Sequence, residues 1–227
     1  MVKIYLDPGH GGSDPGAIGN GLQEKDVNLK IALKIRDMLN DYEGVSVRMS
    51  RTTDKTVSLR QRTDDANKWG ADYYVSIHIN AGGGRGYEDF IYNGKVSSKT
   101  IANQNVMHDE IRKTTSYFTN RGKKRANFHV LRETKMPAFL SENGFIDNKS
   151  DANRLKQSKT IDDIAQGHVN GLVRIFGLKK KKATQKPSSN KGKLYKVQVG
   201  AFSKKSNAEK LANELKKKGY ATYIVQQ

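Results

Sequence analysis

Two histidines and two glutamates stand where an apolar stretch of the sequence gives way to glycine or to the start of a helix. His10 lies in a Pro-Gly-His-Gly-Gly turn after the first β-prone run, and His78 ends a second such run beside a glycine cluster. Glu24 opens a helical pattern, and Glu142 directly follows another short apolar run before an Asn-Gly turn. Because ligand sites in open α/β sheets gather at the carboxyl ends of strands, we expect these four side chains to share one site.

The residue types favour metal chemistry. The chain has no cysteine, which excludes disulfides and thiolate sites, so a metal must be held by His, Asp or Glu. His10, Glu24 and His78 predict a Zn²⁺ site with three protein ligands and a fourth position for water. Glu142 is the candidate carboxylate outside the metal shell, which would take a proton from that water and return it to a leaving amine.

Plainer explanations stay open at this point. His10 could be a partly exposed loop histidine after a strand, and Glu24 a carboxylate paired with the dipole of its helix. We interpret His129 as an interior strand position, and His108 and His168 as surface or packing residues on helices.

Alternation of strand and helix patterns predicts a three-layer α/β/α domain over residues 1–178, with a mixed, mainly parallel central sheet. Expected strands or extended segments cover 2–6, 45–49, 73–79, 85–92, 127–131 and 137–140. Five helices are expected. One begins at Glu24, and one runs from a capping box at Ser58 to just before Gly70. The others are 101–113, a short helix capped by Ser150, and 161–176.

The C-terminal part is strongly basic. Net charge is +18, and residues 179–227 hold 14 lysines against two glutamates, a net +12. Residues 179–193 are interpreted as a basic linker, and residues 194–227 as one βαβ unit with strands at 194–202 and 220–225 around a helix at 207–218. Such a tail is either a solvated face or an attractor of anionic cell-wall polymers. Few aromatics lie among the lysines, which disfavours nucleic acid.

Short motifs run in one order through residues 1–177. They are Asp7-Pro-Gly-His-Gly-Gly, Asp14-Pro-Gly-Ala, Ser50-Arg51-Thr-Thr-Asp54, Ser76-Ile-His-Ile-Asn80, Val130-Leu-Arg132 and Pro137-Ala-Phe-Leu-Ser-Glu142-Asn-Gly-Phe-Ile146. On these residues the sequence resembles the zinc-dependent N-acetylmuramoyl-L-alanine amidases of the amidase-3 family, including short bacillus sporulation amidases and phage endolysins. The resemblance implies that His10, Glu24 and His78 bind zinc and that Glu142 is catalytic. It also implies cleavage of peptidoglycan between N-acetylmuramic acid and L-alanine.

Three further residues recur in that family pattern: Arg51, Arg62 and Asn67. A salt bridge at the sheet edge or a cap explains these three residues as well as substrate contact does. Some family members carry a long helix after the second histidine that plugs the site, and the short span after Asn80 predicts that this chain has none.

The tail segment Tyr195-Lys-Val-Gln-Val-Gly-Ala-Phe202 resembles the peptidoglycan-binding SPOR domain. That domain usually has two βαβ halves, and this chain holds one, so we expect a monomer or a weak dimer formed through the half-domain.

The sequence shows neither a signal peptide nor an apolar run of transmembrane length. We therefore expect synthesis in the cytoplasm and release to the cell wall by lysis, a holin or non-classical export. Two alternative functions remain: a zinc peptidase that cuts within the stem peptide, and a non-catalytic wall-binding module.

Overall fold

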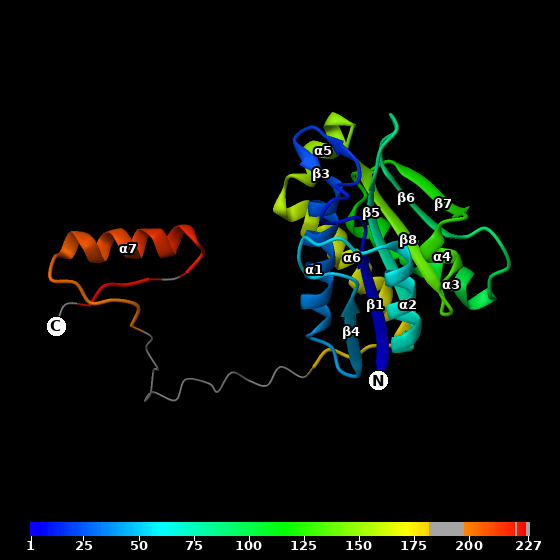
Figure 1. Ribbon diagram of the computed structural model, residues 1–227, viewed down its shortest axis with the longest axis horizontal. Coiled ribbons are helices and arrows are strands. Elements are labelled where there is room, and N and C mark those ends of the chain that lie inside the picture. The colour runs from blue at the N-terminus through cyan, green and yellow to red at the C-terminus, as the bar shows by residue number, and fades with distance from the viewer. Residues whose placement is uncertain (182–197, 221, 226–227) are drawn as a thin grey trace. The chain divides into compact units, whose positions relative to one another are not determined.

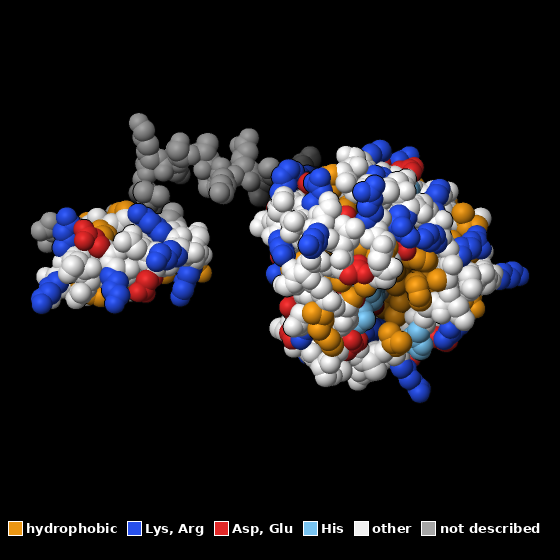
Figure 2. Space-filling view, turned by 90° about the horizontal axis from the view of Figure 1, so that it is seen from above, with side chains coloured by type: hydrophobic (Ala, Val, Ile, Leu, Met, Phe, Trp, Pro, Cys, Tyr) orange, Lys and Arg blue, Asp and Glu red, His pale blue; other side chains and the backbone are white. Residues whose placement is uncertain are grey.

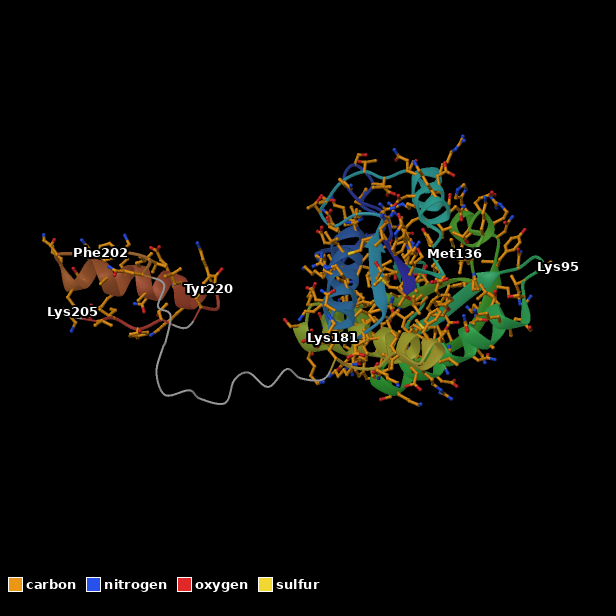
Figure 3. All side chains as sticks on the ribbon, turned by 90° about the horizontal axis from the view of Figure 1, so that it is seen from below. Lys95, Met136, Lys181, Phe202, Lys205 and Tyr220 are labelled. Atoms are coloured by element: carbon orange, nitrogen blue, oxygen red, sulfur yellow. The ribbon has the colours of Figure 1, made fainter. Side chains whose placement is uncertain are left out.

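The computed structural model describes residues 1–181, 198–220 and 222–225 (Figure 1). The chain divides into two compact units, Met1–Lys182 and Ala183–Gln227, which are described separately. Lys181, labelled in Figure 3, ends the described part of the first unit. Its backbone N–H donates to the carbonyl of Asp41, and Lys179 accepts from the N–H of Glu43, so the start of the basic segment lies on the first unit.

A six-stranded sheet forms the centre of the first unit, in the order β4-β1-β5-β8-β6-β7 (Figure 1). Its strands are β1 Val2–Pro8, β4 Val45–Met49, β5 Tyr73–Asn80, β6 Tyr87–Tyr92, β7 Asn120–Ala126 and β8 Ala138–Phe145. Every neighbouring pair is parallel except β6 and β8, which are antiparallel. The expected mixed, mainly parallel sheet is confirmed.

Helices cover both faces of this sheet. They are α1 Glu24–Leu39, α2 Leu59–Trp69, α3 Ser98–Thr114, α4 His129–Arg132, α5 Lys149–Leu155 and α6 Ser158–Phe176. Apolar side chains of α1, α3 and α6 pack with one face of the strands in the larger core cluster. Ala66 of α2 and Val130 and Leu131 of α4 pack with Tyr5, Tyr74 and Leu140 on the other face. The three-layer α/β/α arrangement is therefore also confirmed.

Local sequence signals explain where two of the helices begin and end. Helix α1 starts at Glu24 as expected, and its buried stripe of Val27, Ile31 and Ile35 recurs at helical spacing. Helix α2 has the capping box at Ser58, whose side chain accepts from the N–H of Gln61. It ends at Gly70 in the left-handed conformation, as the sequence predicts.

Several expected boundaries are wrong. Residues 127–131 do not form a strand: the strand is the polar β7 just before them, and the apolar residues belong to helix α4. A charged edge strand lacks the apolar alternation by which strands are recognised. Helix α5 is capped by Asn148, whose Oδ1 accepts from the N–H groups of Ser150 and Asp151, so Ser150 is not the cap.

The turn-rich segment before α1 contains a small hairpin that the sequence analysis missed. Strands β2 Ile18–Gly19 and β3 Leu22–Gln23 are antiparallel, and Asn20 and Gly21 join them with positive φ angles of 50° and 76°. This is the backbone twist that two-residue hairpin turns favour. The second strand of the hairpin ends at Gln23, so helix α1 begins directly after it at Glu24.

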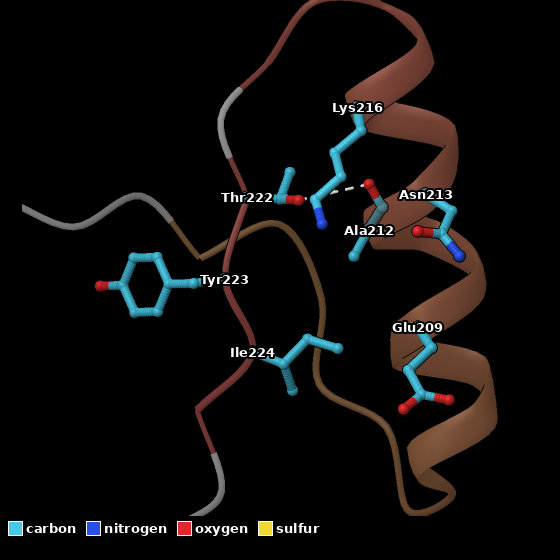
Figure 4. A pocket seen from close by; sticks show the side chains of 7 residues that line it. All are labelled: Glu209, Ala212, Asn213, Lys216, Thr222, Tyr223 and Ile224. Atoms are coloured by element: carbon cyan, nitrogen blue, oxygen red, sulfur yellow. Dashed lines mark hydrogen bonds between the residues drawn. The ribbon is translucent and has the colours of Figure 1, made fainter.

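In the described part of the second unit, the regular element is helix α7, Lys205–Lys217. Residues 198–202 and 222–225 are not in strands, so the expected strands are not found there; residues 194–197 and most of the 179–193 segment lie outside the described residues. Thr222 and Ile224 face α7 across a small pocket in which the Thr222 hydroxyl donates to the Ala212 carbonyl (Figure 4). Lys205 is the first residue of the helix, and Tyr220 follows its C-terminal end (Figure 3).

Candidate active site

Glu24 is the centre of the candidate site. It stands in the first turn of α1, is 4% exposed, and turns both carboxylate oxygens toward the ends of β1 and β5. Its Oε2 lies 3.2 Å from Nε2 of His10, and its Oε1 lies 2.9 Å from Nδ1 of His78. Backbone N–H groups of Ala17 and Ile79 donate to the same carboxylate. The structure thus brings together the three residues predicted as metal ligands.

Protonation in this cluster follows from the contacts. Burial by itself would raise the pKa of Glu24. The hydrogen bonds that Glu24 makes with His10 and His78, together with the positive charge of these histidines, outweigh burial and hold the pKa well below its usual range. For His10, burial by itself would lower the pKa. The hydrogen bonds of His10 with Glu24 and Asp14, and the negative charge of these carboxylates, outweigh burial and raise the pKa. The carboxylate is therefore ionised and ready to act as a ligand.

Asp14 orients the first imidazole. The Nδ1 of His10 lies 2.8 Å from Oδ2 of Asp14. A carboxylate that is ionised can only accept, so Nδ1 donates and Nε2 is directed at Glu24. A carboxylate behind a histidine fixes its tautomer in this way in metal sites generally. In the sequence, Asp14 belongs to the Asp14-Pro-Gly-Ala motif, which by itself does not indicate this role.

Glycines allow the backbone to approach the imidazoles closely. A Cβ on Gly9 would lie 2.2 Å from Cε1 of His78, and a Cβ on Gly16 would lie 2.6 Å from Oε2 of Glu24. His10 itself has φ of 61°, which is uncommon for a residue with a side chain. Positive φ at His10 and glycine at its neighbours therefore set the position of both rings.

The donor set fits zinc. One nitrogen of each histidine and one oxygen of Glu24 lie within 4.8 Å of one another. The His–Glu separations of 3.2 and 2.9 Å are near the roughly 3.4 Å between two ligands held tetrahedrally about 2.1 Å from one ion. Neutral imidazole and carboxylate are ligands that zinc accepts.

Glu142 lies beside this cluster on the neighbouring strand. It pairs in register with His78, and the expectation that it follows its strand is wrong, because β8 continues to Phe145. Its Oε2 is buried and has no hydrogen-bond partner among the described residues. Burial, and then the charges of Glu24 and Glu88, raise its pKa well above the usual range. A carboxyl group of this kind is suited to accept and return a proton.

Two arginines support the turn that carries His10. Arg62 is 3% exposed and donates to Asp7 Oδ1 at 2.6 Å and to the His10 carbonyl at 2.7 Å. Arg51 is 1% exposed and donates to the carbonyls of Pro8, Gly9 and Lys25. Both side chains are enclosed by protein, so they position the turn and do not contact substrate.

The remaining residues singled out in the sequence lie away from the proton-transfer chemistry. The amide of Asn67 bridges the Glu133 carbonyl and the Lys135 N–H. His129 begins helix α4 and is not in a strand, which corrects its expected position. His108 and His168 are buried packing residues and not surface residues: His108 contacts Asp89, and His168 lies 2.9 Å from the hydroxyl of Ser141.

Asn28 is a site residue that the sequence analysis missed. It is fully buried one helical turn after Glu24, and its amide donates to Glu24 Oε1 at 3.2 Å. Residues four apart on a helix lie on one face, so a polar residue at this spacing on an otherwise apolar stripe was the available signal.

The site opens at one end of the sheet. Figure 2 shows histidine and acidic atoms in a hollow bordered by hydrophobic side chains and by lysines and arginines. Phe90 and Phe128 form part of the apolar surface of this unit, with rings 5.3 Å apart in an edge-on arrangement. Residues 81–86 join β5 to β6 without a helix.

Two imidazoles converging on a buried carboxylate, next to a second carboxyl group without a partner, form the kind of site found in metal-dependent hydrolases. Comparison with known proteins specifies the class: residues 4–174 match the Amidase_3 family model, N-acetylmuramoyl-L-alanine amidase, and the chain belongs to this family. Residues 191–227 match the SPOR domain.

Close relatives cover almost the whole chain. It is 56% identical to the N-acetylmuramoyl-L-alanine amidase CwlM of Bacillus licheniformis and 54% identical to the sporulation-specific N-acetylmuramoyl-L-alanine amidase of Bacillus subtilis (strain 168). Each alignment covers 99% of this chain and 85% of the relative. The catalytic domain of CwlV from Bacillus (Paenibacillus) polymyxa var. colistinus superposes with a TM-score of 0.75 at 34% identity, covering 79% of this chain and all of that one.

The activity follows from family and fold together. The protein is a peptidoglycan amidase that cleaves between N-acetylmuramic acid and L-alanine, and it acts on the cell wall. Among the described residues, no helix combines the length and apolarity needed to cross a bilayer.

Proposed function

We propose that the amidase is zinc-dependent, with His10, Glu24 and His78 as the protein ligands and Glu142 as the catalytic acid and base. The observation that carries this proposal is the convergence of two imidazole nitrogens on the two oxygens of one buried carboxylate. Zinc, when bound there, supplies Lewis acidity that polarises water and the scissile carbonyl.

The chain's own residues move the proton. Glu142, ionised when water enters, takes one proton from the attacking water as the water oxygen bonds to the lactyl carbonyl carbon. The C–N bond then breaks, and Glu142 returns that proton to the nitrogen of L-alanine. Because Oε2 is buried and has no partner among the described residues, it is free to accept the proton, and its raised pKa allows the proton to be held between the two transfers.

We further propose that the protein acts in cell-wall lysis during sporulation, and that the second unit retains it on the wall. The name of the 54% identical Bacillus subtilis relative supports the first statement, and the SPOR match supports the second. Exposed lysines of α7, among them Lys205, Lys210 and Lys217, would add attraction to anionic wall polymers. The half-domain leaves the protein a monomer or a weak dimer.

Zinc binding and catalysis can be separated by substitution. In calorimetric titration of the chelator-treated full chain, wild type and Glu142→Gln should each bind one equivalent of zinc, and His78→Ala should not. Glu142→Gln should release at least about a hundredfold fewer L-alanine amino termini from peptidoglycan than wild type. Tight stoichiometric binding by His78→Ala would overturn the ligand assignment, and wild-type turnover by Glu142→Gln would overturn the role of Glu142.

A further inference from the structure

A second carboxylate lies next to Glu142 but has a different environment. Glu88 on β6 pairs in register with Glu142 and is 4% exposed. Its Oε1 accepts from the amide of Asn80 at 2.8 Å, and its Oε2 accepts from Nε of Arg121 at 2.6 Å and from the ammonium group of Lys124. Since both oxygens are already occupied, Glu88 is a poor proton acceptor. It holds two cations in place.

Arg121 and Lys124 retain N–H groups that Glu88 does not use. The side chains of Arg121 and Lys124 are 35% and 37% exposed, and one carboxylate neutralises one of their two charges. Among the described residues, the guanidinium Nη groups of Arg121 make no hydrogen bond, and its plane lies over the ring of Phe145 at 4.9 Å. The pair therefore presents N–H groups and a net positive charge to solvent beside Glu142.

The sheet fixes how far this charge is from the reacting bond. His78, Glu142 and Glu88 occupy consecutive positions across β5, β8 and β6, and neighbouring strands are about 4.8 Å apart. The β6–β7 ladder is irregular between Tyr87 and Asp89, and Lys124 pairs with Phe90. Arg121 and Lys124 therefore lie on either side of the row and reach Glu88 through their side chains. Two strand spacings place Glu88 about 10 Å from His78. A peptide extends about 3.4 Å per residue, so a group two or three residues beyond the scissile amide falls near this pair.

We propose that Arg121 and Lys124, held by Glu88, form a subsite that binds a carboxylate of the stem peptide while Glu142 acts on the scissile amide. This inference rests on the proposed function. The chemistry fits because a guanidinium and an ammonium group recognise carboxylate through charge-assisted hydrogen bonds. The carboxylate can belong to the acidic second residue of the stem peptide or to its C-terminus. Arg121 and Lys124 are specificity residues, and Glu88 is a positioning residue.

The test uses soluble disaccharide tripeptides in three forms: both carboxylates free, the second residue amidated, and the C-terminus amidated. Wild-type enzyme should have a KM roughly fivefold lower for the free form than for the amidated form that removes the recognised group, with kcat little changed. Lys124→Met should lose this preference, and Lys124→Arg should keep it. Lys123→Met is the matched control and should keep the preference. Lys123 is the neighbour of Lys124 on β7, but its ammonium group donates to Asn105 and not to Glu88.

The outcomes separate the inference from the proposed function. Sensitivity to one amidated form identifies the source of the carboxylate. If wild type cleaves all three substrates with the same KM, the subsite does not exist although the amidase proposal stands. A preference that survives in both Lys124→Met and Arg121→Met also overturns the inference. If none of the three substrates is cleaved, the proposed function itself is wrong.

Discussion

The buried ion pair of Asp7 and Arg62 allows the most quantitative prediction. Asp7 is 1% exposed and accepts from Arg62, Ser50 and Ser76 at 2.6, 2.7 and 2.9 Å. Replacing Arg62 with methionine removes the only charged donor in that set and leaves an ionised carboxylate in the protein interior. Breaking a buried pair in this way costs about 3–5 kcal/mol, a large part of the roughly 5–15 kcal/mol by which a domain is stable.

Urea unfolding of the full chain measures this loss. The single tryptophan, Trp69, lies in α2 and reports on the first unit alone. We expect Arg62→Met to lower the free energy of unfolding by about 4 kcal/mol. Arg60→Met is the matched control on the same helix, because the Arg60 side chain is 87% exposed, and it should change stability by less than about 0.5 kcal/mol.

A double variant isolates the charge. Asp7→Asn combined with Arg62→Met removes the buried ion and should recover a substantial part of the loss. Burial by itself would raise the pKa of Asp7, but the charge and hydrogen bond of Arg62 outweigh it and lower the pKa. Wild-type stabilisation by this pair is therefore present above about pH 4 and is lost as pH falls below that value. An Arg62→Met protein within 1 kcal/mol of wild type would refute this reasoning.

Three further predictions concern other parts of the molecule. Burial lowers the pKa of His168 to about 4, so as pH falls the unfolded chain is protonated at this residue before the folded chain is. The free energy of unfolding should therefore fall by roughly 3 kcal/mol between pH 6.5 and 4. His168→Gln should reduce this dependence on pH in urea unfolding, and an unchanged dependence would exclude His168 as its cause. Gly16→Ala, whose Cβ would meet Glu24, should weaken zinc binding at least about tenfold in calorimetric titration, whereas unaltered affinity would show that the close approach is unimportant. Deletion of residues 183–227 should leave turnover of soluble muropeptides within about twofold while sedimentation shows weaker, less salt-sensitive retention on sacculi; loss of soluble turnover would show that the second unit takes part in catalysis.

The site was largely predictable because its residues carry local signals. Proline and glycines around His10 mark an abrupt strand end, and Glu24 opens a regular apolar stripe. The placement of Glu142 was not predictable in detail. Ser141 and Asn143 have the composition of a turn, but they lie inside β8, where distant groups pair with them: Asn143 donates to the carbonyl of His78, and Ser141 contacts His168.

The supporting residues depend on long-range contacts that no local pattern contains. Asp7 and Arg62 are 55 positions apart, and each alone has the sequence context of an ordinary surface charge. Strand β7 escaped detection because Arg121, Lys123 and Lys124 give it the composition of a loop, although it closes the edge of the sheet. Contacts between residues far apart in the sequence thus determine the Asp7–Arg62 pair and strand β7, which periodicity and turn residues do not reveal.

The central claim is that Glu142 moves the proton while His10, Glu24 and His78 hold zinc. The most direct measurement is mass spectrometry of muropeptides released from purified sacculi by zinc-loaded wild type, Glu142→Gln and the control Glu43→Gln, which changes an exposed residue. Wild type and Glu43→Gln should both generate new L-alanine amino termini. Glu142→Gln, with zinc bound, should generate at least about a hundredfold fewer. Equal release by Glu142→Gln and wild type would contradict the account.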